Sequence, residues 1–154
     1  MIHIWKQVQS LPIDIRTAWD FFSTPENLNE ITPPDLSFKI HSSLPARVYP
    51  GLMIVYDVSV FKGIRFEWVT EITHVRELDF FVDEQRFGPY SLWHHEHHFK
   101  EIVGGVEMID IVHYKLPFGW LGDRFHKIMI EPKLKKIFDY RRLTLKQRFG
   151  VYPK

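Results

Sequence analysis

The sequence feature that most constrains the fold is a series of short segments with the alternating pattern of β-strands, followed by one long segment with helical spacing. Glycine or proline residues interrupt the alternating pattern where turns are needed. The connections are short, so neighbouring strands should pair antiparallel. The expected strands cover residues 2–8, 38–43, 52–60, 64–75, 79–87, 91–100 and 106–116.

Helical spacing occupies the remaining parts of the chain. Apolar residues between Ile15 and Phe22 recur at positions i, i+3, i+4 and i+7, which predicts an amphipathic helix. A second short helix should follow Thr24, whose side chain is suited to cap its N-terminus. From about residue 119 to residue 148 we expect one long helix or a bent pair, with a restart at Pro132, which has no amide hydrogen to donate.

Together these elements predict an α+β fold: a seven-stranded antiparallel sheet, two short helices after the first strand, and a long C-terminal helix over one face of the sheet. No repeat or linker interrupts the sequence, so we expect residues 1–154 to form a single domain. Aromatic residues make up 16% of the chain, which suits a thick core and also the wall of a cavity for an apolar ligand.

Composition excludes several classes of function. Lys and Arg number 20 and Asp and Glu number 19, so there is no general attraction to nucleic acid or to an acidic membrane. The chain has no cysteine, which rules out disulfides, thiolate catalysis and cysteine metal sites. No stretch is apolar over the roughly 20 residues of a membrane helix, and the N-terminal segment lacks the apolar core of a signal peptide. We therefore expect a cytoplasmic protein without stable membrane insertion.

The segment Trp93–Phe99 has the sequence WHHEHHF, with four histidines in seven residues. Alternate residues of a strand share a face, so His95 and His97 lie on the same side as the two aromatic residues at its ends. We assign that side to the interior. His94 and His98 then lie on the opposite face, where we expect them to be exposed surface residues.

The following strand carries Asp110, and alternation alone does not decide which of its faces is buried. A hairpin turn near residues 103–105 would place Asp110 roughly opposite His97 or His95, on whichever face they share. If Asp110 is buried, it should lie within hydrogen-bond reach of one of these histidines, with Gln85 or Tyr114 nearby.

This histidine and aspartate set has three interpretations. A hydrogen-bonded structural network is favoured, because buried polar groups need partners. A role of the same network in ligand recognition comes next, and a metal site with two histidines and one carboxylate is the last. The helical His-Glu-x-x-His zinc motif is excluded, because these histidines lie on a strand. We expect no metal and no cofactor.

Four stretches carry a resemblance to a known superfamily: LPIDIRTAWDFFSTPENLNEITPP, FVDEQRFGPYSLWHHEHHF, MIDIVHYKLPFGWLG and IFDYRRLTL. They run in this order over nearly the whole chain. With them the sequence resembles the START-like or Bet v 1-like superfamily, also called SRPBCC, and within it small bacterial proteins related to polyketide cyclases/dehydrases and lipid-transport proteins. The resemblance implies a helix-grip fold, in which the sheet curls around the C-terminal helix and an apolar ligand occupies the cavity between them.

The resemblance also implies which strand faces point inward, and it places Asp110 inside. It supplies no catalytic residues that can be carried over, so the catalytic set is unknown. It leads us to expect a ligand-binding set that consists of Tyr56, Trp68, Phe81, Gln85, Trp93, His95, His97, Asp110 and Tyr114.

The function that we expect is binding of a hydrophobic or amphipathic small molecule, such as a lipid, a polyketide or an aromatic compound. The alternative is an enzyme of the cyclase, dehydratase or hydrolase type, in which a cavity aspartate orients a histidine that acts as general base. An interaction protein with a filled pocket is a third interpretation.

Overall fold

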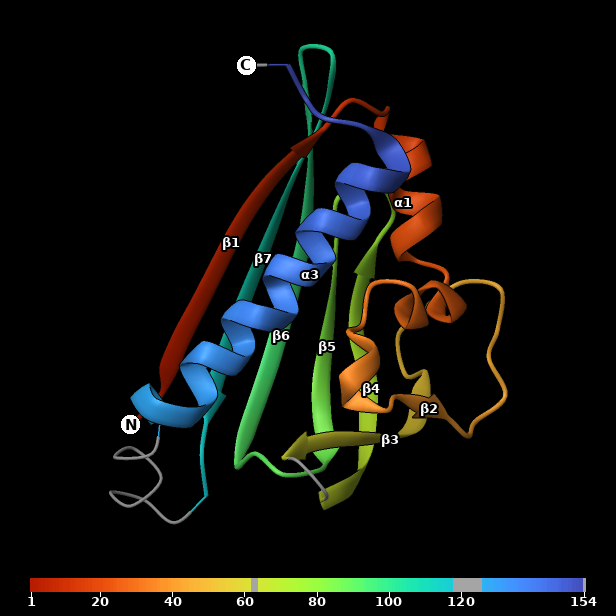
Figure 1. The fold of residues 1–154 in the computed structure, drawn as a ribbon. Coiled ribbons are helices and arrows are strands. Elements are labelled where there is room, and N and C mark those ends of the chain that lie inside the picture. Colours follow the sequence, from red (N-terminus) through yellow and green to blue (C-terminus); the bar gives the residue numbers. More distant parts are fainter. Residues whose placement is uncertain (62–63, 118–125, 154) are drawn as a thin grey trace.

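The computed structural model describes residues 1–61, 64–117 and 126–153. Within these residues, seven strands form one antiparallel sheet with the order β1-β7-β6-β5-β4-β3-β2 (Figure 1). The sheet agrees with the expected fold class. The strands are β1 (His3–Leu11), β2 (Lys39–Ile40), β3 (Met53–Phe61), β4 (Ile64–Arg76), β5 (Phe80–Phe87), β6 (Leu92–Ile102) and β7 (Gly105–Lys115).

The hairpin of β6 and β7 sets the register of the central sheet. The two strands pair without interruption from Leu92 opposite Lys115 to Ile102 opposite Gly105. Gly105 is required at the turn end of β7, because a Cβ atom there would collide with the carbonyl oxygen of Leu11 in the neighbouring β1. Glycine therefore allows β7 to start directly beside the end of β1.

Three short helical segments follow β1: α1 (Ile15–Phe22) and the 3₁₀ segments η1 (Pro25–Asn29) and η2 (Pro34–Leu36). The first two match the expected pair, whereas η2 was not predicted. Asp14 caps α1 by accepting a hydrogen bond from the amide of Thr17. Thr24 precedes η1 as expected, but its side chain does not cap that segment, because the hydroxyl donates to the carbonyl oxygen of Asp20 instead.

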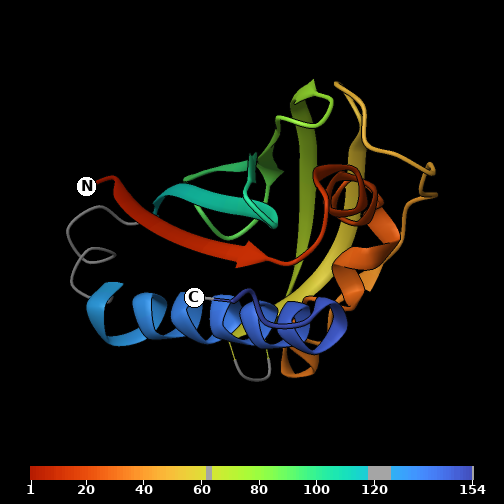
Figure 2. The ribbon, with the colours of Figure 1, turned by 90° about the horizontal axis from the view of Figure 1, so that it is seen from above.

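The C-terminal helix α3 (Glu131–Phe149) follows the π-helical turn η3 (His126–Ile130), so the helix restarts near Pro132 as predicted. Residues 119–125 of the expected helix lie outside the described residues. Figure 2 shows α3 running along the open side of the curved sheet. Its buried residues recur at helical spacing and form the face toward the sheet; they are Leu134, Phe138, Arg141 and Leu145.

The core beneath α3 has an apolar part at each end and polar residues between them. At one end Trp19 of α1 packs edge-on against Phe99 of β6, with ring centroids 5.6 Å apart. At the other end Phe138 of α3 stacks on Trp5 of β1. The inward face of β7 runs through both apolar parts and the polar residues between them. Met108 belongs to the part with Trp19, Val112 belongs to the part with Phe138, and the buried Asp110 lies between these two residues. The candidate site is therefore in the middle of the sheet.

No helix in the described ranges is long and apolar enough to span a membrane.

Candidate functional site

Three adjacent strands bring four polar side chains together on the inner face of the sheet. Asp83 of β5 pairs with His95 of β6, and His97 of β6 pairs with Asp110 of β7. His95 and His97 are two residues apart, so they share the inward face. The placement of these four residues thus follows directly from strand parity and register. We call them, together with Arg141 of α3, the polar cluster.

Asp110 is the acceptor at the centre of the polar cluster. Its Oδ1 lies 3.0 Å from Nε2 of His95 and 3.1 Å from Nδ1 of His97. The same oxygen accepts a 3.0 Å hydrogen bond from Nη1 of Arg141. The expected proximity of Asp110 to the histidines is confirmed. Its further hydrogen bond comes from Arg141, whereas Gln85 or Tyr114 was expected beside it.

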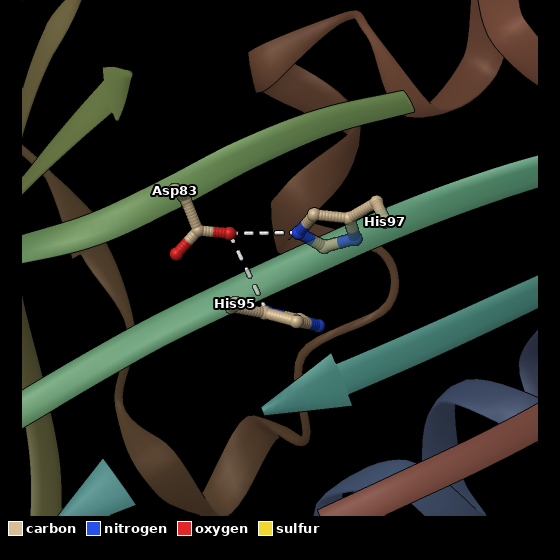
Figure 3. Close-up of side chains that lie close together, drawn as sticks. All are labelled: Asp83, His95 and His97. Carbon is tan, nitrogen blue, oxygen red and sulfur yellow. Dashed lines mark hydrogen bonds and ion pairs between the residues drawn. The ribbon is translucent and has the colours of Figure 1, made fainter. Parts of the chain in front are cut away.

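Asp83 contacts the same two histidines from the other side. Its Oδ2 lies 2.7 Å from Nε2 of His97 and 3.4 Å from Nδ1 of His95 (Figure 3). The two imidazole rings lie close together, with centroids 3.8 Å apart. Each imidazole is therefore held between two carboxylates.

Burial and neighbouring charges oppose each other in setting the pKa values of the cluster. Burial alone would raise the pKa of Asp110, but the positive charge of Arg141 and the histidine hydrogen bonds hold it well below its usual range. For Asp83, too, burial is outweighed by the histidines, and its pKa is lowered. Both carboxylates are therefore ionised at neutral pH.

The pKa values of the two histidines shift in opposite directions. Burial would lower the pKa of His97, but hydrogen bonds to Asp110 and Asp83 outweigh it and raise the pKa. Burial and the neighbouring His97 lower the pKa of His95.

A cavity of about 200 Å³ lies between the sheet, α3 and the segment of residues 21–38. Six of the residues expected to bind a ligand line it: Tyr56, Trp68, Phe81, Trp93, His95 and His97.

The other three expected ligand-binding residues do not contribute to the cavity wall in the described part of the chain. Gln85 exchanges two hydrogen bonds with the backbone of Tyr90, which fixes the loop between β5 and β6. Asp110 contacts the histidines, and Tyr114 is 1% exposed and packs against the rings of Tyr90 and Trp93.

Two kinds of wall residue were outside the expected ligand-binding set. The segment before β2 contributes Leu28, Ile31 and Leu36, whose placement depends on tertiary packing. Asp83 and Arg141 also line the cavity, although neither was in the expected ligand-binding set. Arg141 could have been found, because it is a charged residue on the apolar face that Leu134 and Phe138 form.

Further polar groups line the cavity away from the cluster. The hydroxyl of Tyr56 and Oγ1 of Thr70 are 3.0 Å apart, and burial raises the pKa of Tyr56. Lys133 of α3 also reaches the cavity, and burial lowers its pKa. The wall is otherwise mainly aliphatic and aromatic, so it can hold an apolar body and orient a polar group.

His94 and His98 lie on the outer face of β6, as parity predicted, but the expectation that they are exposed is wrong. Their side chains are 32% and 34% exposed. Nδ1 of His94 lies 2.9 Å from Oε1 of Glu84, and Nε2 of His98 lies 2.7 Å from Oε2 of Glu96. Acidic neighbours on β5 and β6 therefore cover part of each ring.

Comparison with solved structures gives full-length matches at low sequence identity. An uncharacterised protein from Rhizobium leguminosarum matches with 14% identity and a TM-score of 0.68, over 96% of both chains. Major latex-like protein 151 from Panax ginseng matches with 13% identity and a TM-score of 0.68, over 96% of this chain and 97% of that one. A protein from Chromobacterium violaceum matches with 9% identity and a TM-score of 0.72, over 97% and 98% of the two chains.

No sequence-family model and no curated protein matches the chain. The structural matches show a shared fold, with a seven-stranded antiparallel sheet and a long C-terminal helix. This is the helix-grip fold that the resemblance to Bet v 1-like proteins predicted.

Proposed function

We propose that this protein binds a small amphipathic molecule in the cavity between the sheet and α3. The observation that carries the proposal is that Asp83, His95, His97 and Arg141 are largely buried and yet line a cavity whose wall is mainly apolar. The apolar body of the ligand would pack against the aromatic wall, and its polar group would meet the polar cluster. The helix-grip fold, which is known for binding hydrophobic ligands, supports this proposal.

The size of the cavity favours a small ligand. Its volume of about 200 Å³ exceeds the ~150 Å³ of an engineered cavity that takes up benzene. It is smaller than the ~300–1,000 Å³ typical of pockets for drug-sized molecules. Of the expected ligand classes, we therefore favour an aromatic compound of one or two rings over a long-chain lipid or a large polyketide.

Fluorescence titration with a two-ring naphthalene dye tests the proposal. We expect saturable binding of one dye per chain. Val58 is 6% exposed and lines the cavity, so Val58→Phe should fill part of the space and weaken binding. Val8 is 48% exposed on β1, so Val8→Phe is a matched control and should leave binding unchanged. No saturable binding, or equal binding by both variants, would refute the proposal.

A second candidate function is catalysis by a histidine of the cluster. The observation in its favour is that His95 and His97 both line the cavity, each within reach of an aspartate that can fix its tautomer. Once a bound molecule has been identified, it is incubated with the protein and analysed by chromatography and mass spectrometry. A dehydratase should lower its mass by one water, a hydrolase should yield two fragments whose masses sum to the substrate plus one water, and a cyclase should yield a product of changed retention with the same mass or one water less. An unchanged mass and an unchanged retention after prolonged incubation would indicate binding alone.

A further inference from the structure

The two buried histidines can both donate to the same acceptor. Oδ1 of Asp110 accepts a hydrogen bond from Nη1 of Arg141, and it lies 3.0 Å from Nε2 of His95 and 3.1 Å from Nδ1 of His97. A neutral imidazole has only one N–H. When both of these nitrogens donate to Asp110, each neutral ring therefore keeps its lone pair on the opposite nitrogen, Nδ1 of His95 and Nε2 of His97.

Both lone pairs face the same carboxylate oxygen. Oδ2 of Asp83 lies 2.7 Å from Nε2 of His97 and 3.4 Å from Nδ1 of His95 (Figure 3). Three electron-rich atoms at these distances repel one another unless a positive species lies between them. That species is either a proton on an imidazole or a metal ion.

We propose that Asp83, His95 and His97 bind a divalent transition-metal ion, such as Zn²⁺ or Fe²⁺. Two imidazoles and one carboxylate with free positions beside them are a typical ligand set for these ions. Asp110 would orient both imidazoles from their opposite nitrogens, as carboxylates commonly do for metal-bound histidines, and Arg141 would hold Asp110. The site departs from the expectation that the chain holds no metal, and its carboxylate is Asp83 where the sequence suggested Asp110.

The distances suit an ion after a small adjustment. Tetrahedral zinc with bonds of about 2.0–2.1 Å holds its ligand atoms roughly 3.3 Å apart. The 3.4 Å between Asp83 and His95 already fits, and the 2.7 Å between Asp83 and His97 must open by about 0.6 Å. Oδ1 of Asp83 has no hydrogen-bond partner among the described residues, so this side chain can move. The three ligand atoms lie within 4.8 Å of one another.

The ion would give the polar group of the proposed ligand a defined binding position. This part of the inference rests on the proposed function. Asp83, His95 and His97 all line the cavity, so a free coordination position would face it. A carboxylate, carbonyl or hydroxyl oxygen on the amphipathic ligand could then bind the ion directly. The ligand class becomes an aromatic or short-chain molecule with one such oxygen-bearing group.

A second group of side chains that could coordinate a metal ion serves as a control for the buried site. His94, Glu96 and His113 lie together on the outer face of the sheet, with Nε2 of His94 and Nδ1 of His113 at 3.4 Å and 3.9 Å from Oε1 of Glu96. The side chains of His94 and His113 are 32% and 34% exposed and that of Glu96 is 26% exposed, and Glu96 also shares a hydrogen bond with His98. Water competes for this group more strongly than for the buried one.

Calorimetric titration of the chelator-treated protein with Zn²⁺ tests the proposal. We expect one ion per chain, with an affinity that falls by more than about 10-fold in Asp83→Asn and stays unchanged in His113→Asn. Loss of binding in His113→Asn but not in Asp83→Asn would place the ion on the outer face and overturn the proposal, as would no binding at all. Binding of the naphthalene dye to the zinc-free protein is a separate readout, so the proposed function survives if only zinc fails.

Nitrogen-15 NMR of the imidazoles in the unmodified protein gives a result even if Asp83→Asn does not fold. Zinc should shift Nδ1 of His95 and Nε2 of His97, and it should leave both nitrogens of His94 and His113 in place. The reverse pattern would contradict the site.

Discussion

Replacing Asp110 with alanine removes the acceptor on which the polar cluster depends. The Asp110 side chain is 8% exposed and accepts hydrogen bonds from His95, His97 and Arg141. Without it, the guanidinium of Arg141, whose side chain is 10% exposed, loses its ion-pair partner. Two imidazole N–H groups also lose their acceptor. The variant should therefore be much less stable than the wild type.

The size of the stability loss in Asp110→Ala follows from the burial of the ion pair between Asp110 and Arg141. Removing one partner of a buried ion pair costs about 3–5 kcal/mol of unfolding free energy. With a denaturant dependence of about 2 kcal/mol per molar urea, the unfolding midpoint should fall by roughly 2 M. For a chain of 154 residues the melting temperature should fall by roughly 6–20 °C. Equilibrium urea unfolding followed by tryptophan fluorescence measures the change.

Two further variants show whether the loss reflects the buried pair. Asp139 also forms ion pairs, with Lys135 and Arg142, but its side chain is 35% exposed, so Asp139→Ala should cost about 1 kcal/mol or less. Adding Arg141→Met to Asp110→Ala should recover part of the stability, because it removes the stranded charge. If Asp110→Ala costs no more than Asp139→Ala, or if the double variant recovers nothing, the cluster is not a buried and coupled unit.

Three other perturbations have defined outcomes. The folded-state pKa of Asp110 lies well below the unfolded value of about 3.9, so its contribution to the unfolding free energy is complete above that value and is lost as pH falls through the folded pKa. In urea unfolding at a series of acidic pH values, the unfolding free energy should therefore fall less steeply with decreasing pH for Asp110→Asn than for the wild type. Equal slopes would contradict this. Gly105→Ala places a methyl group against a backbone carbonyl of β1 and should lower the melting temperature strongly. Gly104→Asn should lower it far less, because Asn tolerates the φ of +75° at that turn. Similar melting temperatures for the two variants would show that β1 shifts to accommodate the methyl group. Changing His94 and His98 to serine should cost about 1 kcal/mol or less each in urea unfolding, and a loss of several kcal/mol would show that the outer face is coupled to the core.

The strands and their buried faces were largely predictable, because the two-residue period of a strand translates directly into two faces. The inward positions of His95 and His97 follow from that period alone. The buried face of β7 could not be derived from the period, since Ile109 and Ile111 favour burial of the face opposite Asp110. Only the resemblance placed Asp110 inside. In the structure these two isoleucines are half-buried on the outer face.

The partners within the site were not predictable from local pattern. Arg141 reaches Asp110 across 31 residues of sequence, and that contact depends on where α3 crosses the sheet. Arg141 shares the buried face of α3 with Leu134 and Phe138, but helical spacing alone cannot identify its partner. The cavity wall contributed by residues 21–38 depends in the same way on packing of irregular chain, which no periodicity describes.

Native mass spectrometry tests the central claim, that the cavity holds a small amphipathic molecule, most directly. The protein is incubated with a protein-free extract of small molecules and then separated from unbound material. We predict a second species that carries the mass of one small organic molecule, persists in Val8→Phe and is lost in Val58→Phe. A spectrum with only the bare chain, or an added mass that survives equally in Val58→Phe, would contradict the claim.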